Sequence, residues 1–195
     1  MKLVLGTKNQ GKIREILSLL SDVPQLELLT FRECSFRDIA ETGQTFRENA
    51  LLKASEISAE TKLAVLAEDS GLEVGALNGA PGILSARFAG EKATDQQNIR
   101  KLLKQLEGID WRYARFVCVA VLRFTDGKEL IAEGELRGYI AHEPRGTHGF
   151  GYDPVFIPER YEQTLGELGS SIKDMISHRG VALGEIKRKL LQFKL

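Results

Sequence analysis

Two adjacent carboxylates, Glu68 and Asp69, follow the apolar run Leu63–Ala67. This run predicts a strand that ends at Ala67 and is buried on both faces, as at the centre of an α/β sheet. Ligands of open α/β sheets bind outside the carboxyl ends of strands, so both acids are candidates for a site. Neighbouring carboxylates repel each other unless a proton or a cation neutralises them. Magnesium (Mg²⁺) takes such ligands together with substrate phosphates.

A third acid, Glu41, precedes the helix that we expect to begin near Thr45. If the fold brings Glu41 to the end of the strand, then Glu41, Glu68 and Asp69 are the expected metal ligands. A metal held by acids screens phosphate oxygens, and a carboxylate accepts the proton of an attacking water. Asp69 is the better candidate for this base because it is nearest the loop in which a substrate would lie. Taken alone, these acids are equally typical of a solvated surface.

The segment G-T-K-N-Q-G-K-I, which begins at Gly6, fits the phosphate-binding pattern G-x-x-x-x-G-K-[ST] except at its last position. Ile13 stands where a hydroxyl would hold magnesium, and it belongs to the apolar face of the following helix. We therefore expect the phosphates to bind the loop amides with Thr7, Asn9 and Lys12, and the metal to be held elsewhere. A P-loop ATPase or nucleotide kinase is the main alternative interpretation.

Three cations in separate segments, Lys53, Lys173 and Arg179, are candidates for contacts with an anionic substrate. Each taken singly is more typical of a surface charge. Lys53 lies four residues after Asn49, so the two share one edge of the expected helix, and that edge could face Asp69. His178 follows an apparent N-cap serine and is equally explained as part of a helix start.

The loop GTHGFGYDP, residues 146–154, combines glycines with Phe150, Tyr152 and Asp153. Aromatic rings suit stacking against a purine, whose edge an aspartate can read through hydrogen bonds. The same aromatics could instead form a small core cluster under the loop. From the residues alone, we predict a metal-dependent enzyme that acts on a nucleotide phosphate.

A pattern of strands and helices surrounds these residues and predicts an α/β fold. Helical periodicity follows the opening strand, begins again at Thr45, and recurs over residues 94–106, where Thr94-Asp95-Gln96-Gln97 is a capping-box signature. Two long strands, 115–124 and 129–140, are joined through an Asp-Gly pair that favours a hairpin. The last helix carries an apolar face that consists of Leu183, Ile186, Leu190 and Phe193.

The composition is that of an ordinary soluble globular protein: 195 residues, 43% of them hydrophobic, with 27 Lys+Arg against 27 Asp+Glu. The zero net charge removes the broad attraction expected of a non-specific nucleic-acid binder. Cys34 and Cys118 are too far apart for a zinc site and indicate reduced thiols in a cytoplasmic protein. The first residues lack a signal-peptide pattern, and no apolar run is long enough to span a membrane.

The sequence resembles the non-canonical purine NTP pyrophosphatases (inosine triphosphate pyrophosphatases) over nearly its whole length. Six segments occur in the order typical of that family: TKNQGK, AETGQTFRENALLKA, AEDSGLEV, GAPGILSARFAG, GTHGFGYDPVF and SHRGVAL. Several motifs in register are far more specific than any one alone. The sequence departs from the commonest family pattern at Lys8, Glu68 and His148.

The resemblance implies a homodimeric, magnesium-dependent enzyme that hydrolyses ITP, dITP and XTP to the monophosphate and pyrophosphate and so removes deaminated purines from the nucleotide pool. It implies a single domain, 1–195, with a mixed central sheet, flanking helices and two lobes around a central nucleotide-binding cleft. Asp69 would be the catalytic base, and Glu41, Asp69 and Glu68 would serve the metal. The implied substrate contacts are Thr7, Lys8, Asn9, Gln10, Gly11, Lys12, Lys53, Ser70, Phe150, Gly151, Tyr152, Asp153, Lys173, His178 and Arg179.

Selectivity for such bases has a physical basis. Hypoxanthine and xanthine carry an oxygen at C6 where adenine carries an amino group. Donors from Lys173, His178 or Arg179 would satisfy that oxygen, whereas adenine would leave them unpaired at a cost of about 1–3 kcal/mol each. The remaining alternatives are a Maf-like nucleotide pyrophosphatase with another base preference and a nucleotide sensor without turnover.

Overall fold

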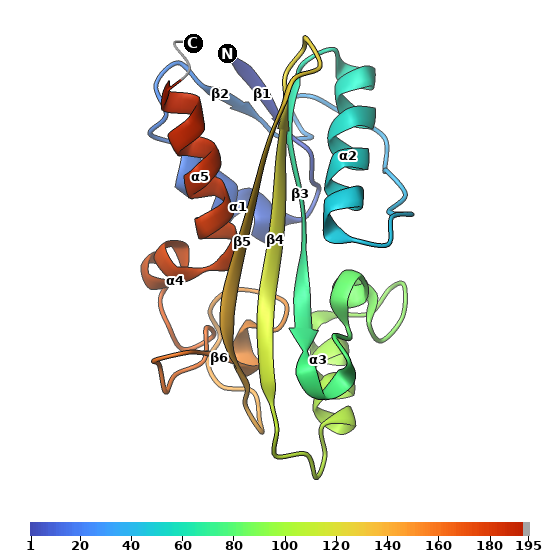
Figure 1. Ribbon diagram of the computed structural model, residues 1–195, viewed down its shortest axis with the longest axis vertical. Coiled ribbons are helices and arrows are strands. Elements are labelled where there is room, and N and C mark those ends of the chain that lie inside the picture. The colour runs from blue at the N-terminus through green and yellow to red at the C-terminus, as the bar shows by residue number, and fades with distance from the viewer. Residues whose placement is uncertain (193–195) are drawn as a thin grey trace. The chain divides into compact units, whose positions relative to one another are not determined.

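The computed structural model describes residues 1–192 and contains six strands in that range. They are β1 (Lys2–Leu5), β2 (Glu27–Leu29), β3 (Ala64–Val74), β4 (Tyr113–Arg123), β5 (Glu129–Ile140) and β6 (Phe156–Pro158). The strands form one sheet in the order β2-β1-β3-β4-β5-β6. β1 pairs in parallel with β2 and β3, whereas β5 and β6 are antiparallel, so the sheet is mixed. Helices flank the strands (Figure 1), which confirms the predicted α/β class.

The helices predicted from Thr45 and over residues 94–106 are present, whereas the helix over Ser170–Ile176 was not predicted. The helices in the described residues are α1 (Gln10–Leu20), α2 (Phe46–Thr61), α3 (Asp95–Gln105), α4 (Ser170–Ile176) and α5 (His178–Gln192). The start of α3 has the predicted capping box between Thr94 and Gln97. The turn between β4 and β5 is the predicted hairpin, since the Phe124 N–H donates to the Lys128 carbonyl. Phe193, expected on the last helix, lies outside the described residues.

The chain divides into two compact units. The first comprises Met1–Asp69, Cys118–Gly134 and the chain from Arg179 onward, and the second comprises Ser70–Val117 and Glu135–His178. The boundary between the units therefore falls within β3, β4 and β5, and each of these strands contributes one segment to the first unit and one to the second. The single domain over 1–195 and the central cleft stay predictions.

In the first unit, helices cover both faces of the strands. Figure 1 shows α1 and α5 on one side of β3 and α2 on the other. Leu5 of β1 pairs with Leu66 of β3, and both belong to the core that packs on α1 and α5. Gly6 and Ala67, which follow Leu5 and Leu66, face α2, because a Cβ at Gly6 would contact both Ala67 and Ile57 of α2.

β3 continues through the two acids to Val74, so the expected strand end at Ala67 was wrong. Successive side chains of a strand point to opposite faces of the sheet. Glu68, two positions after Leu66, therefore lies on the face covered by α1 and α5, and Asp69 lies on the face covered by α2. The pleat separates two carboxylates that are adjacent in the sequence.

The second unit has a core of its own. Leu72 of β3, Leu102 of α3 and Phe156 of β6 are fully buried there. The rings of Phe116 and Phe156 lie 4.6 Å apart in the same core. Tyr152 also belongs to this core, which therefore anchors the glycine-rich loop of residues 146–154.

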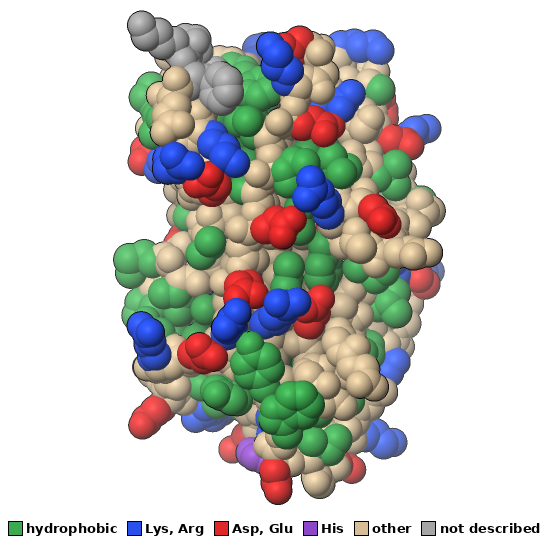
Figure 2. Space-filling model, viewed as in Figure 1, with side chains coloured by type: hydrophobic (Ala, Val, Ile, Leu, Met, Phe, Trp, Pro, Cys, Tyr) green, Lys and Arg blue, Asp and Glu red, His purple; other side chains and the backbone are tan. Residues whose placement is uncertain are grey.

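Charges on the surface are mixed by sign. On the face shown in Figure 2, basic and acidic side chains are interspersed, in agreement with the balance of 27 basic and 27 acidic residues. Within residues 1–192, every helix is too short or too polar to cross a membrane.

Candidate active site

Two carboxylates of the first unit converge on one buried ammonium. Lys53 Nζ, on α2, donates to Glu41 Oε1 at 2.6 Å and to Asp69 Oδ1 at 3.3 Å. Lys53 and Asp69 are buried, and the Glu41 side chain is 26% exposed. The structure thus brings the acid of the early loop and the acid of β3 to one point. We call these two residues the Glu41–Asp69 pair.

Burial and charge act in opposite directions on Asp69 and Lys53. Burial is the largest influence on the Asp69 carboxyl and raises its pKa, whereas the Lys53 charge lowers it, and the net pKa is raised. Burial lowers the pKa of Lys53, but the Asp69 and Glu41 carboxylates outweigh it, so this pKa is also raised. The lysine therefore stays charged, and Asp69 is a stronger base than an exposed aspartate.

Glu68 lies in a separate buried cluster on the other face of β3. Its Oε1 faces Lys12 Nζ at 3.0 Å and Arg179 Nη2 at 3.2 Å. Arg179 also pairs with Glu15 of α1, and the Cys118 thiol lies 3.5 Å from Glu68 Oε2. These five residues, which we call the Glu68 cluster, tie β3 and β4 to α1 and α5.

The cations of this cluster keep Glu68 ionised. Burial alone would raise the pKa of its carboxyl, but Arg179 and Lys12 outweigh burial and hold the pKa well below its ordinary value. The structure does not bring Glu68 to the Glu41–Asp69 pair, because the pleat of β3 turns it to the opposite face. Among residues 1–192 the three acids do not form one metal-binding group, and a role for Glu68 in holding the metal stays a prediction.

The predicted phosphate loop leads into the N-terminus of α1. Asn9 caps this helix, since its Oδ1 accepts from the Lys12 N–H at 3.0 Å, and Thr7 Oγ1 accepts from the Asn9 N–H at 3.2 Å. The remaining amides and the helix dipole at this end favour an anion. Of the other predicted loop contacts, Lys8 and Gln10 are exposed and Gly11 is buried.

In the second unit, two of the predicted base-recognition residues, Phe150 and Lys173, contact Asp153. Asp153 Oδ2 accepts from the Lys173 ammonium at 2.5 Å and from the Phe150 N–H at 2.8 Å. The ammonium also lies 4.7 Å from the centre of the Phe150 ring, at a distance typical of a cation–π contact. Gly149 has a φ of +76°, and a Cβ there would collide with the Asp153 carboxylate, so this loop conformation requires glycine.

Two further contacts hold this loop in place. The Gly151 N–H donates to Asp95 Oδ2 at 2.7 Å, at the first residue of α3. The Tyr152 hydroxyl donates to the Ser85 carbonyl at 2.9 Å, and burial raises the pKa of this tyrosine. Tyr152 is 4% exposed, so its ring supports the loop from within the core.

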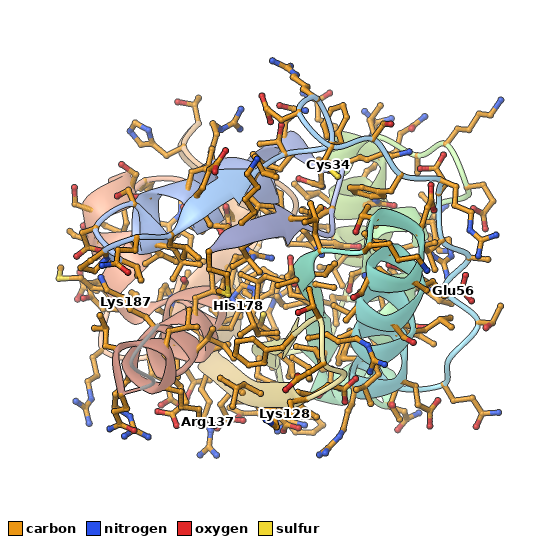
Figure 3. The ribbon with its side chains drawn as sticks, turned by 90° about the horizontal axis from the view of Figure 1, so that it is seen from above. Cys34, Glu56, Lys128, Arg137, His178 and Lys187 are labelled. Atoms are coloured by element: carbon orange, nitrogen blue, oxygen red, sulfur yellow. The ribbon has the colours of Figure 1, made fainter. Side chains whose placement is uncertain are left out.

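The predicted site residues thus fall into two groups. The phosphate and metal candidates belong to the first unit, where the Glu41–Asp69 pair and the Glu68 cluster lie on opposite faces of β3. His178 belongs to the second unit; its ring stacks on that of Phe116 with centroids 4.7 Å apart, and Figure 3 shows it in the interior. The other candidates in the second unit are Ser70, Phe150, Gly151, Tyr152, Asp153 and Lys173.

The sequence predicted the edge of α2 that faces Asp69, but it did not identify two acids that contact predicted site residues. The expected edge of α2 does face Asp69, because Asn49 Nδ2 donates to Asp69 Oδ2 at 3.1 Å. Glu15, which pairs with Arg179, and Asp95, which holds the glycine-rich loop, were not identified. Asp95 lies within the capping box at the start of α3, but nothing in that box points to the glycine-rich loop, and the partner of each acid is remote in the sequence.

The Glu41–Asp69 pair fits a magnesium ion by the chemistry of its donors. Magnesium takes hard oxygen ligands from one or two carboxylates and keeps water or substrate phosphate oxygens for the rest. Two carboxylates that already face one cation supply such a set. Among residues 1–192, no group of three or more His, Cys, Asp or Glu side chains could hold a metal, so phosphate or water oxygens would have to complete the coordination.

Comparisons with known proteins agree over nearly the full chain. The model of the Ham1 family matches residues 3–189. The dITP/XTP pyrophosphatase of Bacillus licheniformis is 46% identical, with 98% of each chain aligned, and that of Vibrio parahaemolyticus is 47% identical, with 97% of this chain and 96% of the relative aligned. The structure of a HAM1 protein from Coxiella burnetii gives a TM-score of 0.90 at 43% identity and covers 98% of this chain and 99% of its own. The Ham1 protein of Staphylococcus aureus gives 0.88 at 39% identity over 100% of both chains.

Proposed function

This chain belongs to the Ham1 family, and we infer that it hydrolyses non-canonical purine nucleoside triphosphates such as ITP, dITP and XTP to the monophosphate and pyrophosphate. This activity removes deaminated purines from the nucleotide pool. The full-length similarity to dITP/XTP pyrophosphatases sets aside a P-loop kinase and a Maf-like enzyme. Ile13 is buried in the core that packs on α1 and has no hydroxyl for a metal, which also disfavours the P-loop interpretation.

The observation that carries the catalytic proposal is the convergence of Glu41 and Asp69 on Lys53. Asp69 would accept the proton of a water that attacks the α-phosphorus. The new bond forms between the water oxygen and that phosphorus, the bond to the oxygen that bridges the α- and β-phosphates breaks, and pyrophosphate leaves. The raised pKa of the buried Asp69 carboxyl supports this role, and Lys53 would neutralise charge on the phosphates.

We extend the proposal to dependence on magnesium. Glu41 and Asp69 would hold the ion, which when bound would screen the phosphate oxygens that repel an incoming nucleophile. The loop of residues 7–12 would bind the triphosphate at the N-terminus of α1. Homodimerisation and a cytoplasmic location enter the proposal from the family resemblance alone.

Phe150, Asp153 and Lys173 would recognise the base. The Lys173 ammonium is a donor suited to the 6-oxo group of hypoxanthine or xanthine, and the Phe150 ring offers a face for stacking. Adenine would leave a buried donor unsatisfied, at a cost of about 1–3 kcal/mol. Proposed contacts that rest on the resemblance are Ser70, Gly151, Tyr152, His178 and Arg179.

Pyrophosphate release from ATP, GTP, ITP and XTP, with magnesium and with EDTA, tests the proposal. We expect ITP and XTP to be hydrolysed far faster than ATP, and EDTA to abolish turnover. Asp69→Asn should lose turnover while it still binds ITP in calorimetry, because an amide is no base. Asp126→Asn, in the exposed β4–β5 turn, is the control and should behave as the wild type. Release of the γ-phosphate alone, or near-normal turnover by Asp69→Asn, would refute the proposal.

A further inference from the structure

Asn49 of α2 is fully buried, although asparagine is a poor helix former and a buried amide is costly unless it is hydrogen bonded. Both ends of this side chain are bonded. Its Oδ1 accepts from the Gly43 N–H at 2.8 Å, and its Nδ2 donates to Asp69 Oδ2 at 3.1 Å. The Gly43 N–H can only donate, so it determines which end of the amide faces Asp69.

The Asp69 carboxylate is held by donors from two successive turns of α2. Lys53 Nζ faces Oδ1 at 3.3 Å, and Asn49 Nδ2 faces Oδ2 at 3.1 Å. The lysine ammonium ends a flexible four-carbon stem and is shared with Glu41, so it can move without breaking the helix. The asparagine amide is short and is fixed at its other end to the backbone. Asn49 is therefore the donor that restrains the plane of the carboxylate.

The opposite end of the Asn49 amide holds the loop that carries Glu41. A Cβ at Gly43 would lie 2.7 Å from Asn49 Oδ1 and 2.7 Å from Glu48 Cβ, so the close approach of loop and helix requires glycine. The next residue is also tied to the helix, because the Gln44 N–H donates to Glu48 Oε2 at 2.6 Å. One side-chain amide thus connects the Glu41 loop to β3.

We propose that Asn49 is a positioning residue for the reaction, whose amide orients the Asp69 carboxylate and sets its distance from the loop that bears Glu41. This inference rests on the proposed role of Asp69, and it assigns Asn49 no contact with the substrate. Displacing a reacting group by about 1 Å can cost about 100-fold in rate. Loss of the amide should therefore lower kcat much more than it changes KM, because the proposed binding of the triphosphate involves mainly the loop before α1 and not Asn49.

Two substitutions separate the two ends of the amide. Asn49→Asp keeps an acceptor for the Gly43 N–H but turns a carboxylate toward Asp69, whereas Asn49→Ala removes both bonds. We expect each to lower kcat for ITP by about 10- to 100-fold and to change KM by less than about threefold. Gly43→Ala displaces the amide oxygen and should cause a smaller fall of the same kind.

Asn98→Ala is the matched control for the loss of a buried asparagine. Asn98 of α3 is 2% exposed and, like Asn49, is hydrogen bonded at both ends, but only to the backbone: it accepts from the Ala89 N–H at 2.8 Å and donates to the Ala86 carbonyl at 3.1 Å. Its replacement should lower Tm about as much as Asn49→Ala does, as measured by circular dichroism without nucleotide or metal. The kcat of the Asn98→Ala variant should stay within about twofold of the wild-type value.

Asn49→Ala combined with Asp69→Asn should be no less active than Asp69→Asn alone, because both act through one carboxylate. If both Asn49 variants keep the wild-type kcat while Asp69→Asn is inactive, the positioning inference fails and the proposed function stands. If Asp69→Asn is itself active, the proposed function fails first. An equal loss of kcat in Asn98→Ala would reveal a general effect of destabilisation and would also overturn the inference.

Discussion

Replacing Arg179 by methionine should destabilise the protein, because it leaves Glu68 buried with only part of its neutralising charge. The side chains of Glu68 and Arg179 are 0% and 2% exposed and lie 3.2 Å apart. Removing one partner of a buried ion pair costs about 3–5 kcal/mol. Lys12 remains 3.0 Å from Glu68, so we expect the lower end of that range. A loss of about 3 kcal/mol corresponds to a fall in Tm of about 6–12 °C for a chain of this size.

The pH dependence of this loss has a definite sign. The pKa of Glu68 is held below its ordinary 4.5, so the cluster stabilises the wild type above that pH and loses its effect as the pH falls through the lowered pKa. Without Arg179, less positive charge opposes the effect of burial, so the pKa of the Glu68 carboxyl should rise and the carboxyl should take up its proton at a higher pH than in the wild type. The stability difference between Arg179→Met and the wild type should therefore be largest at about pH 7–8 and shrink toward about pH 5.

Thermal and urea unfolding, followed by circular dichroism, measure this difference. Combining Glu68→Gln with Arg179→Met removes both charges and should recover at least about 1 kcal/mol relative to the sum of the single variants. Glu185→Gln, which breaks an exposed pair with Arg188 on α5, is the control and should leave Tm nearly unchanged. A fall in Tm below about 2 °C for Arg179→Met, or a difference that does not vary with pH, would refute the reasoning.

Two further predictions concern the glycine-rich loop of the second unit. Lys173→Ala should reduce the ratio of kcat/KM for ITP to that for ATP by about tenfold, because it removes a buried donor suited to the 6-oxo group. An unchanged ratio would exclude Lys173 from base recognition. Asp95→Asn should raise KM for ITP in steady-state assays with little change in kcat, because the Gly151 N–H loses a charge-assisted hydrogen bond. A wild-type KM would show that the loop is held without this carboxylate.

Local patterns predicted those elements whose determinants are local. The capping box at Thr94 and the turn between β4 and β5 depend on residues a few positions apart, and both predictions were confirmed. The strand expected to end at Ala67 continues instead, because Arg179 neutralises Glu68 from 111 residues away. The local sequence around the strand does not include Arg179. A strand end at Ala67 was therefore expected, because burying the charge of Glu68 without a partner would be costly.

The candidate site was predictable to a similar degree. A four-residue spacing placed Asn49 and Lys53 on one helix edge, and this edge contacts Asp69. The spacing could not show that Glu68 faces away, because that depends on the strand continuing past Ala67. Glu15 pairs with Arg179, which is 164 residues further along the chain. The residue type of Glu15 alone does not show that it has such a partner.

The alternation along β3 also constrains changes in chain length. Inserting or deleting one residue just before Glu68 would rotate every following side chain by half a turn about the strand. Asp69 would then enter a compartment already crowded with guanidinium and ammonium groups, and its neighbour would take its place opposite α2. Such a change would exchange the two faces of the strand although the amino-acid composition hardly changes. Tolerated insertions are therefore expected in the connecting loops, and a combinatorial library should keep this stretch at constant length.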